Sequence, residues 1–434
     1  MENFVIRGGS PLSGEIVPAG NKNAALPILA ACLLTEEELR IANVPRIRDV
    51  DSMVDLLKGL GVKVEWSGEN ELRLQADSVD EAHEVDEEPA SRIRASFLAA
   101  GPLLARFGEA KIPPPGGDTI GRRRLDAHLD AFRDLGAQVG GEVWIELSGP
   151  PEGLKATRIF MDEPSVMGTE NALLAAALTP GPTTIANAAS EPHVQDLARL
   201  LCKMGAEVDG IGSNVMTVHG RDRLGGAEHR ICPDHIEIAS FMALAAATGG
   251  ELLIRDTVPE DLEGIRRQFR RLGLQSMEKD GDILVPPEQK LTIKDDLGDA
   301  IAKIDDGPWP AFPADLTSIA LALATQADGT ILIFEKMFEN RLFFVDKLVA
   351  MGARITLCDP HRAIVSGPSR LHGARLESPD IRAGMAMLIA ALAAEGTSEI
   401  GNVAQIDRGY ERIDLRLRDL GARIDRVSAE RIHA

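Results

Sequence analysis

The pattern of hydrophobic and polar positions repeats six times along the chain. In each copy an amphipathic stretch runs into a Leu-Gly or Met-Gly pair, and a short run of mainly alternating apolar and polar residues follows. The pattern predicts an amphipathic helix that ends at a glycine and then a strand. A spacing of about 70 residues between copies is typical of a tandem α/β repeat. The six glycines are Gly61, Gly136, Gly205, Gly273, Gly352 and Gly421.

A second series of stretches, rich in alanine and leucine, alternates with the first. These stretches are apolar on nearly every side, so we expect each to be a helix buried within its unit. Most of their residues are then ordinary core. The predicted core helices cover residues 23–34, 93–105, 169–178, 236–248, 314–325 and 381–394.

Polar residues gather at the predicted starts of these core helices. The N-terminal end of a helix carries unpaired N–H groups and a partial positive charge, which suits anion binding. Six such ends facing one cleft would attract a strongly charged substrate. The polar residues are Lys22, Asn23, Arg94, Thr169, Glu170, Asn171, Asp234, Glu237, Asp315, Asp380 and Arg382.

Length and repeat count together predict the domain organisation. The chain has 434 residues, of which 44% are apolar, enough for two sizeable cores of three units each. The sixth unit lacks its last strand, and residues 4–8 could supply it. We therefore predict an N-terminal domain at 22–232 and a C-terminal domain formed by 1–21 and 233–434. The chain would cross twice between the domains, which suits hinge closure on a ligand.

Charge and composition exclude several function classes. A net charge of −20 and an aromatic content of 4% argue against general nucleic-acid or anionic-membrane binding. The apolar runs are shorter than the roughly 18 to 20 residues that span a bilayer, and the N-terminus resembles a strand rather than a signal peptide. We expect a cytoplasmic location. The four cysteines lack any CxxC pattern, so we expect small buried apolar residues, with neither a disulfide nor a metal site.

The segment 113–124, PPPGGDTIGRRR, interrupts the repeat and places Asp118 close to three arginines. Proline stiffens one end, and the glycines permit backbone angles that other residues avoid. The segment could be a mobile lid or an ordinary surface turn with solvated arginines. Other segments rich in arginine and acidic residues lie at 338–341, 378–382 and 406–412. Each is a weak signal alone, because exposed ion pairs are common.

Taken in order, these texts resemble the UDP-N-acetylglucosamine enolpyruvyl transferases, relatives of the 5-enolpyruvylshikimate-3-phosphate synthases, over essentially the whole chain. The resemblance implies an α/β fold of two domains, each an inside-out barrel of three βαβαββ units, with the active site in the cleft between the domains. The matching texts are GNKNAALPILAA at 20–31, RASFLAAGPLLARFG at 94–108, GGDTIGRR at 116–123, SV.GTEN at 165–171, FP.D at 312–315, FENR at 338–341 and IDRGYERI at 406–413.

The resemblance implies transfer of the enolpyruvyl group from phosphoenolpyruvate to the 3-hydroxyl of UDP-N-acetylglucosamine, with release of phosphate. This is the first committed step of peptidoglycan synthesis, and it needs no metal or cofactor. The reaction is an addition followed by an elimination. It requires cations for a phosphate and a carboxylate, a proton donor and a base. No nucleic acid or membrane insertion is implied.

The resemblance assigns roles to individual residues. Lys22, Arg123 and Arg408 match positions near the phosphate, and Arg341 and Arg382 match positions near the carboxylate, where the planar guanidinium binds two oxygens at once. Asp315 matches the position facing the sugar hydroxyl, as a base or as the group that orients the hydroxyl. Asn23 is expected to contact both substrates. The remaining predicted contacts to the nucleotide sugar are Arg94, Arg123, Arg124, Leu125, Asp126, Ala127, Glu163, Pro164, Ser165, Val166 and Met337.

The chain departs from the family at Asp118, where most members carry the cysteine that is the proton donor and the target of fosfomycin. A carboxylate cannot form the same stable adduct, so we predict intrinsic resistance. A carboxyl group beside arginines readily loses its proton. We therefore expect Asp118 to act as a general acid only in the closed, substrate-loaded complex.

Further departures concern the acceptor. Arg124 stands at a usual proline, Ala127 at a usual leucine, and Met167 at a usual glycine. Two alternatives therefore remain. The chain could be a sibling transferase with another acceptor, or a non-catalytic paralogue that binds a nucleotide sugar. The segment 279–310 is long for the repeat and is expected to be a solvated insertion without an assigned function.

Overall fold

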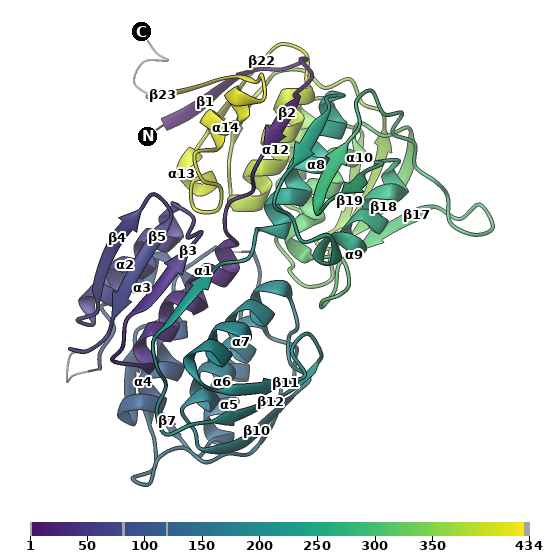
Figure 1. Ribbon diagram of the computed structural model, residues 1–434. Helices are drawn as coiled ribbons and strands as arrows, with labels where there is room; N and C mark the ends of the chain where they lie inside the picture. The colour runs from purple at the N-terminus through teal and green to yellow at the C-terminus, as the bar shows by residue number, and fades with distance from the viewer. Residues whose placement is uncertain (1, 80–82, 119, 429–434) are drawn as a thin grey trace. The chain divides into compact units, whose positions relative to one another are not determined.

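The computed structural model describes residues 2–79, 83–118 and 120–428. Thr119 of the predicted loop 113–124, and parts of the two predicted domains at 1, 80–82 and 429–434, lie outside the described residues. The chain forms two compact units, coloured along the sequence in Figure 1. We call Gly20–Asp118 with Arg123–Cys232 the N-terminal unit, and Met1–Ala19, Thr119–Arg122 and Pro233–Ala434 the C-terminal unit.

The described part of each unit contains three small sheets. In every four-stranded sheet one edge strand runs parallel to its neighbour and the other pairings are antiparallel. In the three-stranded sheet an isolated parallel bridge between Glu84 and Lys111 takes the place of the fourth strand. The strands of the N-terminal unit, in sheet order, are β13 (Ala227–Arg230), β3 (Leu39–Ala42), β5 (Glu71–Gln75) and β4 (Lys63–Gly68); β6 (Glu109–Ile112), β8 (Ile145–Ser148) and β7 (Gln138–Gly140); and β11 (Glu207–Asp209), β12 (Val215–Gly220), β10 (Gly181–Ala186) and β9 (Arg158–Phe160).

The sheets of the C-terminal unit follow the same plan, and the first strand of the chain completes one of them. β1 pairs with β22 and β23, so the predicted completion of the sixth unit by the N-terminal strand is confirmed. The register places Phe4 opposite Ile400 and Ile6 opposite Ile424, all in the core. The sheet orders are β15 (Met277–Lys279), β16 (Asp282–Val285), β14 (Leu252–Ile254) and β2 (Gly14–Ile16); β17 (Ala302–Asp305), β18 (Gly329–Phe334), β20 (Arg362–Gly367) and β19 (Ile355–Asp359); and β21 (Arg375–Glu377), β22 (Thr397–Gly401), β1 (Glu2–Arg7) and β23 (Arg423–Ser428).

The alanine- and leucine-rich stretches are buried helices, as predicted. In α8, for instance, every residue from His235 to Ala246 is buried. Three of these stretches begin or end in a 3₁₀ turn, a common variation at helix ends. The core helices are α1 (Lys22–Ala30) with η1 (Ala31–Leu34), η2 (Arg94–Ala99) with α4 (Ala100–Phe107), α6 (Val166–Ala177), α8 (His235–Thr248), η4 (Ala314–Leu316) with α10 (Thr317–Ala324), and α12 (Ile381–Ala393).

The amphipathic helices end near the six predicted glycines. All six glycines have positive φ, from 86° at Gly273 to 114° at Gly205. This left-handed conformation reverses the chain after a helix and is costly for residues with a Cβ. The helices are α2 (Arg48–Gly59), α5 (Asp126–Asp134), α7 (Pro192–Met204), α9 (Pro259–Phe269) with η3 (Arg270–Leu272), α11 (Val345–Ala350) and α14 (Ile413–Asp419). Two shorter helices are α3 (Glu87–Arg92) and α13 (Val403–Ile406).

Three expectations need correction. The third core helix begins at Val166 rather than Thr169, because the Ser165 hydroxyl accepts the Gly168 N–H and caps the helix earlier. Thr169, Glu170 and Asn171 therefore lie inside the helix and are buried. Cys358 is exposed on β19, so the cysteines are not all buried residues.

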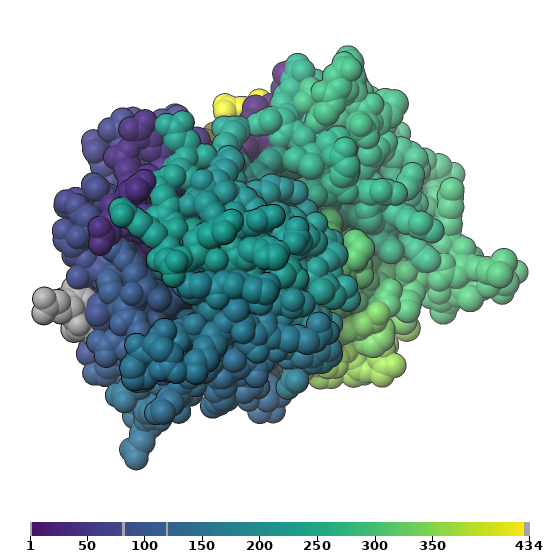
Figure 2. Space-filling view, turned by 60° about the horizontal axis from the view of Figure 1, so that its bottom comes forward, coloured from purple at the N-terminus to yellow at the C-terminus, as the bar shows by residue number. Residues whose placement is uncertain are grey.

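The predicted insertion at 279–310 is largely part of the fold. It contains β16 and β17, and Asp306 is only 1% exposed, so its DDGPWP text is not solvated as a whole. Leu291 and Ile293 belong to the core, and only the segment 294–301 before β17 extends outward, with Leu297 fully exposed (Figure 2, the green projection). Over the described ranges, the helices all fall short of the length and apolar character that crossing a bilayer demands.

Candidate active site

Asp315 of the C-terminal unit lies between two arginines. Arg341 Nη2 is 2.8 Å from Asp315 Oδ1, and Arg382 Nε and Nη2 are 3.0 and 2.9 Å from Asp315 Oδ2. The two arginine side chains are 4% and 5% exposed, and that of Asp315 is 27% exposed. The structure therefore brings together three predicted site residues at one partly open carboxylate, held by charge-assisted hydrogen bonds.

Arg382 is fixed by residues around the start of α12. Asp380 caps this helix and accepts the N–H groups of Arg382 and Ala383. The Tyr410 hydroxyl lies 3.2 Å from Arg382 Nη1 and 3.2 Å from the Ser240 hydroxyl. Burial alone lowers the pKa of Arg382, but Asp315, Tyr410 and Asp234 together more than offset this effect, so the net pKa is raised. The guanidinium is thus charged and is oriented by these neighbouring residues.

Tyr410 is a functional neighbour that the sequence analysis did not identify. It is the only tyrosine of the chain and lies inside the IDRGYER text, which was a usable signal. His235, the first residue of α8, was missed as well. It is 2% exposed, lies edge-on to Trp309, and has a pKa lowered to about 4 by burial and by the charge of Arg382. A neutral imidazole therefore lies close to the charged pair.

Arg341 follows β18 and has a second acidic neighbour. Glu335 Oε2 is 3.9 Å from Arg341 Nε, and the Glu335 side chain is completely buried. Burial raises the pKa of Glu335 to about 8, with Arg341 opposing the rise and Asp306 adding to it. Met337 lies in the same turn, where its N–H donates to Asp306 at 3.3 Å.

Arg408 lies in the turn after α13. Its Nη1 donates to Gln405 Oε1 at 3.0 Å, and the side chain is partly buried. The IDRGYER text thus contributes two residues, Arg408 and Tyr410, at different levels of burial.

In the N-terminal unit, Lys22 is the first residue of α1. Its Nζ is 2.8 Å from Asp49 Oδ2, and both side chains are nearly buried, at 11% and 6% exposure. Asn21 caps the helix by accepting the N–H groups of Asn23 and Ala24. Asn23 is half-buried in the first turn. Asp49 was not predicted, because nothing in a sequence shows which carboxylate meets a given lysine.

Arg94 and the glycines of the loop place Asp118. An added Cβ on Gly116 would lie 1.7 Å from the Ser91 carbonyl oxygen, and one on Gly117 would lie 2.9 Å from the Arg94 Cβ. Gly117 also has φ 105°, so only glycine fits here. The loop backbone therefore packs closely against the start of η2. Asp118 is the residue that directly follows this contact.

The Arg94 guanidinium donates to the Arg123 carbonyl oxygen. Burial, together with the charge of Arg123, lowers the pKa of Arg94 to about 10. Arg94 and Arg123, two predicted site residues, thus lie side by side in the N-terminal unit.

The other predicted nucleotide-sugar contacts lie around the starts of α5 and α6. Arg124 binds Asp126 through two hydrogen bonds, of 2.8 and 2.7 Å, on the surface. Leu125 precedes α5, and an added Cβ on Gly168 would be 3.2 Å from that of Ala127. Glu163 and Pro164 form the turn before Ser165, which caps α6, and Val166 begins this helix.

Thr169 and Asn171 instead make core contacts. Asn171 bonds the Phe97 carbonyl oxygen and the His128 ring, and Thr169 accepts the Ala189 N–H. Their predicted place in the first turn of a ligand-facing helix is therefore wrong.

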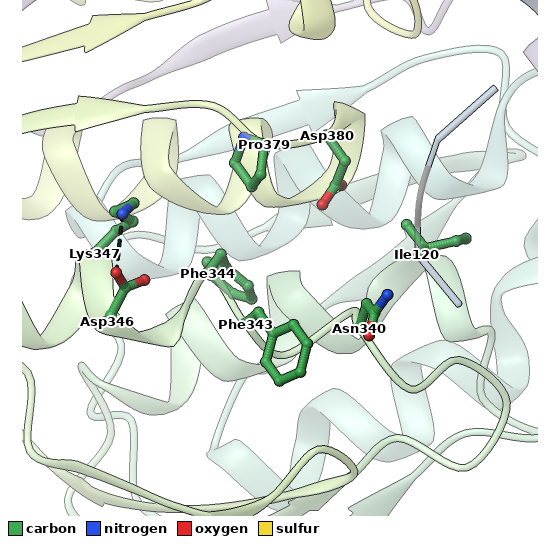
Figure 3. Close-up of a pocket in the computed structure, with 8 residues that line it drawn as sticks. All are labelled: Ile120, Asn340, Phe343, Phe344, Asp346, Lys347, Pro379 and Asp380. Atoms are coloured by element: carbon green, nitrogen blue, oxygen red, sulfur yellow. Dashed lines mark hydrogen bonds and ion pairs between the residues drawn. The ribbon is translucent and has the colours of Figure 1, made fainter. Parts of the chain in front are cut away.

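A cavity of about 350 Å³ lies in the C-terminal unit beside the residues that follow the FENR text. Ile120 reaches this unit, where its carbonyl oxygen accepts the Asn340 N–H at 3.0 Å, and the Arg122 N–H donates to Glu339 Oε2 at 3.2 Å. Figure 3 shows Phe343 and Phe344 between Ile120 and the ion pair of Asp346 with Lys347. Part of the loop 113–124 is therefore held against the segment that carries Arg341.

Solved structures define the class of fold. An enolpyruvyl transferase, NikO from Streptomyces tendae, superposes with a TM-score of 0.87 at 24% identity, covering 99% of both chains. EPSP synthase from Acinetobacter baumannii superposes with a TM-score of 0.75 at 18% identity, covering 99% of this chain and 100% of that one. The fold is therefore that of the enolpyruvyl transferases, and the predicted two-domain α/β class is confirmed.

Sequence relatives define the group more narrowly. The EPSP synthase (3-phosphoshikimate 1-carboxyvinyltransferase) family model matches residues 6–417. A UDP-N-acetylglucosamine 1-carboxyvinyltransferase from Bradyrhizobium diazoefficiens is 56% identical and one from Treponema denticola 53% identical, each over at least 98% of both chains. The chain belongs to the UDP-N-acetylglucosamine 1-carboxyvinyltransferases of the EPSP synthase family, and it is an enzyme of this class.

Proposed function

We propose that this enzyme transfers the enolpyruvyl group of phosphoenolpyruvate to the 3-hydroxyl of UDP-N-acetylglucosamine and releases phosphate, in peptidoglycan synthesis. The observation that carries the proposal is the identity of 53 to 56% over nearly full length to enzymes named for this activity. The arginine pair at Asp315 supports it, because two preoriented guanidinium groups suit a substrate with a carboxylate. Both proposed substrates are cytoplasmic metabolites, so we place the reaction in the cytoplasm.

Arg341 and Arg382 are the proposed ligands of the phosphoenolpyruvate carboxylate. In the structure both bind the carboxylate of Asp315. A substrate carboxylate would compete for the same N–H groups and loosen Asp315. Each Asp315 oxygen is bound by an arginine as long as this pairing lasts. Once released, Asp315 would be able to orient the sugar hydroxyl or accept its proton.

Lys22, Arg123 and Arg408 are the proposed cations for the phosphate. The short contact of Lys22 with Asp49 holds the ammonium group at the first turn of α1, where the helix end adds partial positive charge. Asn23 is proposed to contact both substrates from the same turn. The set is divided between the two units, since Arg408 belongs to the C-terminal unit.

Asp118 is the proposed proton donor to the methylene carbon of phosphoenolpyruvate. The glycines before it fix its backbone beside Arg94. A carboxyl group in this place would transfer a proton reversibly but would not form the stable adduct by which fosfomycin blocks a thiol. We therefore propose that the enzyme is resistant to this compound.

The proposed nucleotide-sugar site consists of residues around the starts of α5 and α6, together with Arg94, Asn23, Asp315 and Met337. Arg124 and Asp126 bind each other at the surface, so the usual proline of the family is replaced by an ion pair. The remaining members are Arg123, Leu125, Ala127, Glu163, Pro164, Ser165 and Val166.

The proposal is tested by measuring phosphate release from phosphoenolpyruvate with UDP-N-acetylglucosamine as acceptor, and separately with shikimate 3-phosphate. We expect release with the nucleotide sugar alone and a carboxyvinyl product of the corresponding mass. Release with shikimate 3-phosphate alone would assign a different acceptor. Binding of UDP-N-acetylglucosamine without any turnover would instead show a non-catalytic paralogue.

A further inference from the structure

Two buried carboxyl groups, Glu335 and Asp306, lie behind Arg341. Asp306 directly follows β17 and Glu335 directly follows β18. These strands are parallel neighbours, with Asp305 opposite Phe334, so the two carboxyl groups leave the same edge of the sheet side by side. The Asp306 N–H also donates to the Phe334 carbonyl oxygen at 3.3 Å. Two acids at 1% and 0% exposure are unusual, since burial of a charged carboxylate is costly.

The two carboxyl groups bind three successive backbone N–H groups. Asp306 accepts those of Lys336 and Met337, and Glu335 Oε1 accepts that of Phe338 at 3.1 Å. The Glu335 carbonyl oxygen also contacts His361 Nδ1, at 2.7 Å. The turn 336–338 is therefore fixed from both sides, and Arg341 follows it by three residues.

Glu335 and Arg341 face each other without a direct hydrogen bond. Their atoms Oε2 and Nε are 3.9 Å apart, and within the described parts of the chain neither atom has a hydrogen-bond partner. Nη2 of the same guanidinium points to Asp315. Arg341 is thus held in place through its backbone. Its Nε–H group donates no hydrogen bond to any described group.

We propose that Glu335 and Asp306 are positioning residues that fix the turn 336–338 and so direct the guanidinium of Arg341 toward the carboxylate of phosphoenolpyruvate. This inference rests on the proposed function. Since the pKa of Glu335 is raised to about 8 by burial, this side chain is mainly neutral at pH 7. A neutral Glu335 does not compete with a substrate carboxylate for Arg341, whereas an ionised one would.

The test compares three variants at Glu335. Glu335→Ala removes the acceptor for the Phe338 N–H, Glu335→Leu does so while filling the space, and Glu335→Gln keeps a neutral acceptor. Because the pair acts on Arg341, we expect Ala and Leu to raise KM for phosphoenolpyruvate at least tenfold with a smaller change in kcat, and Gln to recover most of this loss. Glu395→Ala, at an exposed pair with Arg370 in the same unit, is the control and should leave KM within twofold.

A second comparison tests whether Glu335 acts through Arg341. In an Arg341→Met background, Glu335→Leu should lower kcat/KM for phosphoenolpyruvate by less than threefold, because the group that it positions is already gone. If instead Glu335→Leu lowered kcat at unchanged KM, or acted equally in both backgrounds, the positioning role would be wrong. If Glu335→Ala does not fold, the leucine variant alone decides. A wild-type enzyme without carboxyvinyl transfer would refute the proposed function rather than this inference.

Discussion

Replacing Asp315 by asparagine should destabilise the C-terminal unit in the absence of substrate. The substitution keeps the shape of the side chain but removes the charge that faces Arg341 and Arg382. Both guanidinium groups are at least 95% buried, and neither can lose its proton at neutral pH. Two buried cations would then share an amide oxygen in place of a carboxylate.

The size of the effect follows from burial. Removing one member of a buried ion pair costs about 3 to 5 kcal/mol, mostly because the remaining charge is left uncompensated. The Asp315 side chain is 27% exposed, and water can replace part of its interaction. The Tyr410 hydroxyl also stays in contact with Arg382. We therefore expect a loss of roughly 2 to 3 kcal/mol in the free energy of unfolding, in keeping with the cost of an unpaired buried charge.

The assay is urea unfolding followed by fluorescence of Trp309, which lies in the C-terminal unit next to His235. The other two tryptophans, Trp66 and Trp144, lie in the N-terminal unit and are replaced by phenylalanine in all samples. Glu395→Gln is the matched control, because its pair with Arg370 is 63 to 84% exposed and should contribute little to stability. Equal, small losses in both variants would refute the argument that the arginines depend on Asp315.

Three further predictions concern other parts of the chain. The pKa of Glu335 is raised from 4.5 to about 8 on folding, so this group stabilises the fold fully below about pH 4.5 and progressively less as the pH rises to 8. Between pH 5 and 8, at about 1.4 kcal/mol per pH unit, the loss is roughly 3 to 4 kcal/mol. Urea unfolding at these two pH values should show it in the wild type but not in Glu335→Gln, and an equal change in both proteins would contradict the prediction. Gly205→Ala should lower the free energy of unfolding by about 1 to 2 kcal/mol, because the φ angle of Gly205 is 114°. Gly140→Ala is the control, because Gly140 has open space around it and no positive φ, and thermal unfolding should show little effect there. Similar shifts in both variants would argue against backbone strain. Asp118→Asn should reduce kcat at least about 100-fold, as expected for loss of a general acid, and Asp118→Cys should become sensitive to fosfomycin; near-normal turnover of the asparagine variant would exclude the acid role.

Periodicity predicted the elements whose stability depends on local geometry and burial. The six glycines have positive φ because a helix that turns directly into a strand needs a left-handed residue, and glycine adopts it at the least cost. The core helices could be found because a helix without a polar face must be buried. The partner of β1 followed from counting strands in the sixth unit.

The contacts that define the site were not predictable in the same way. Lys22 meets Asp49 and Arg382 meets Tyr410 across long sequence separations, and periodicity carries no information on such pairs. Asp306 was expected in a solvated insertion, because an acidic run with proline and glycine usually lies at the surface. It is buried because three N–H groups of one turn need acceptors that Asp306 and Glu335 supply.

The site also depends on where the repeats differ. The three core helices of the C-terminal unit, α8, α10 and α12, pack against one another (Figure 1), and their starts carry His235, Asp315 and Arg382. Three like charges at these equivalent positions would repel in a buried place. Instead the starts combine a neutral imidazole with charges of opposite sign: Arg382 binds Asp315, while Asp234 and Asp380 cap the first turns of α8 and α12. Arg341, which comes from outside the helix starts, also binds Asp315. A substrate carboxylate would therefore have to displace Asp315 from the two arginines.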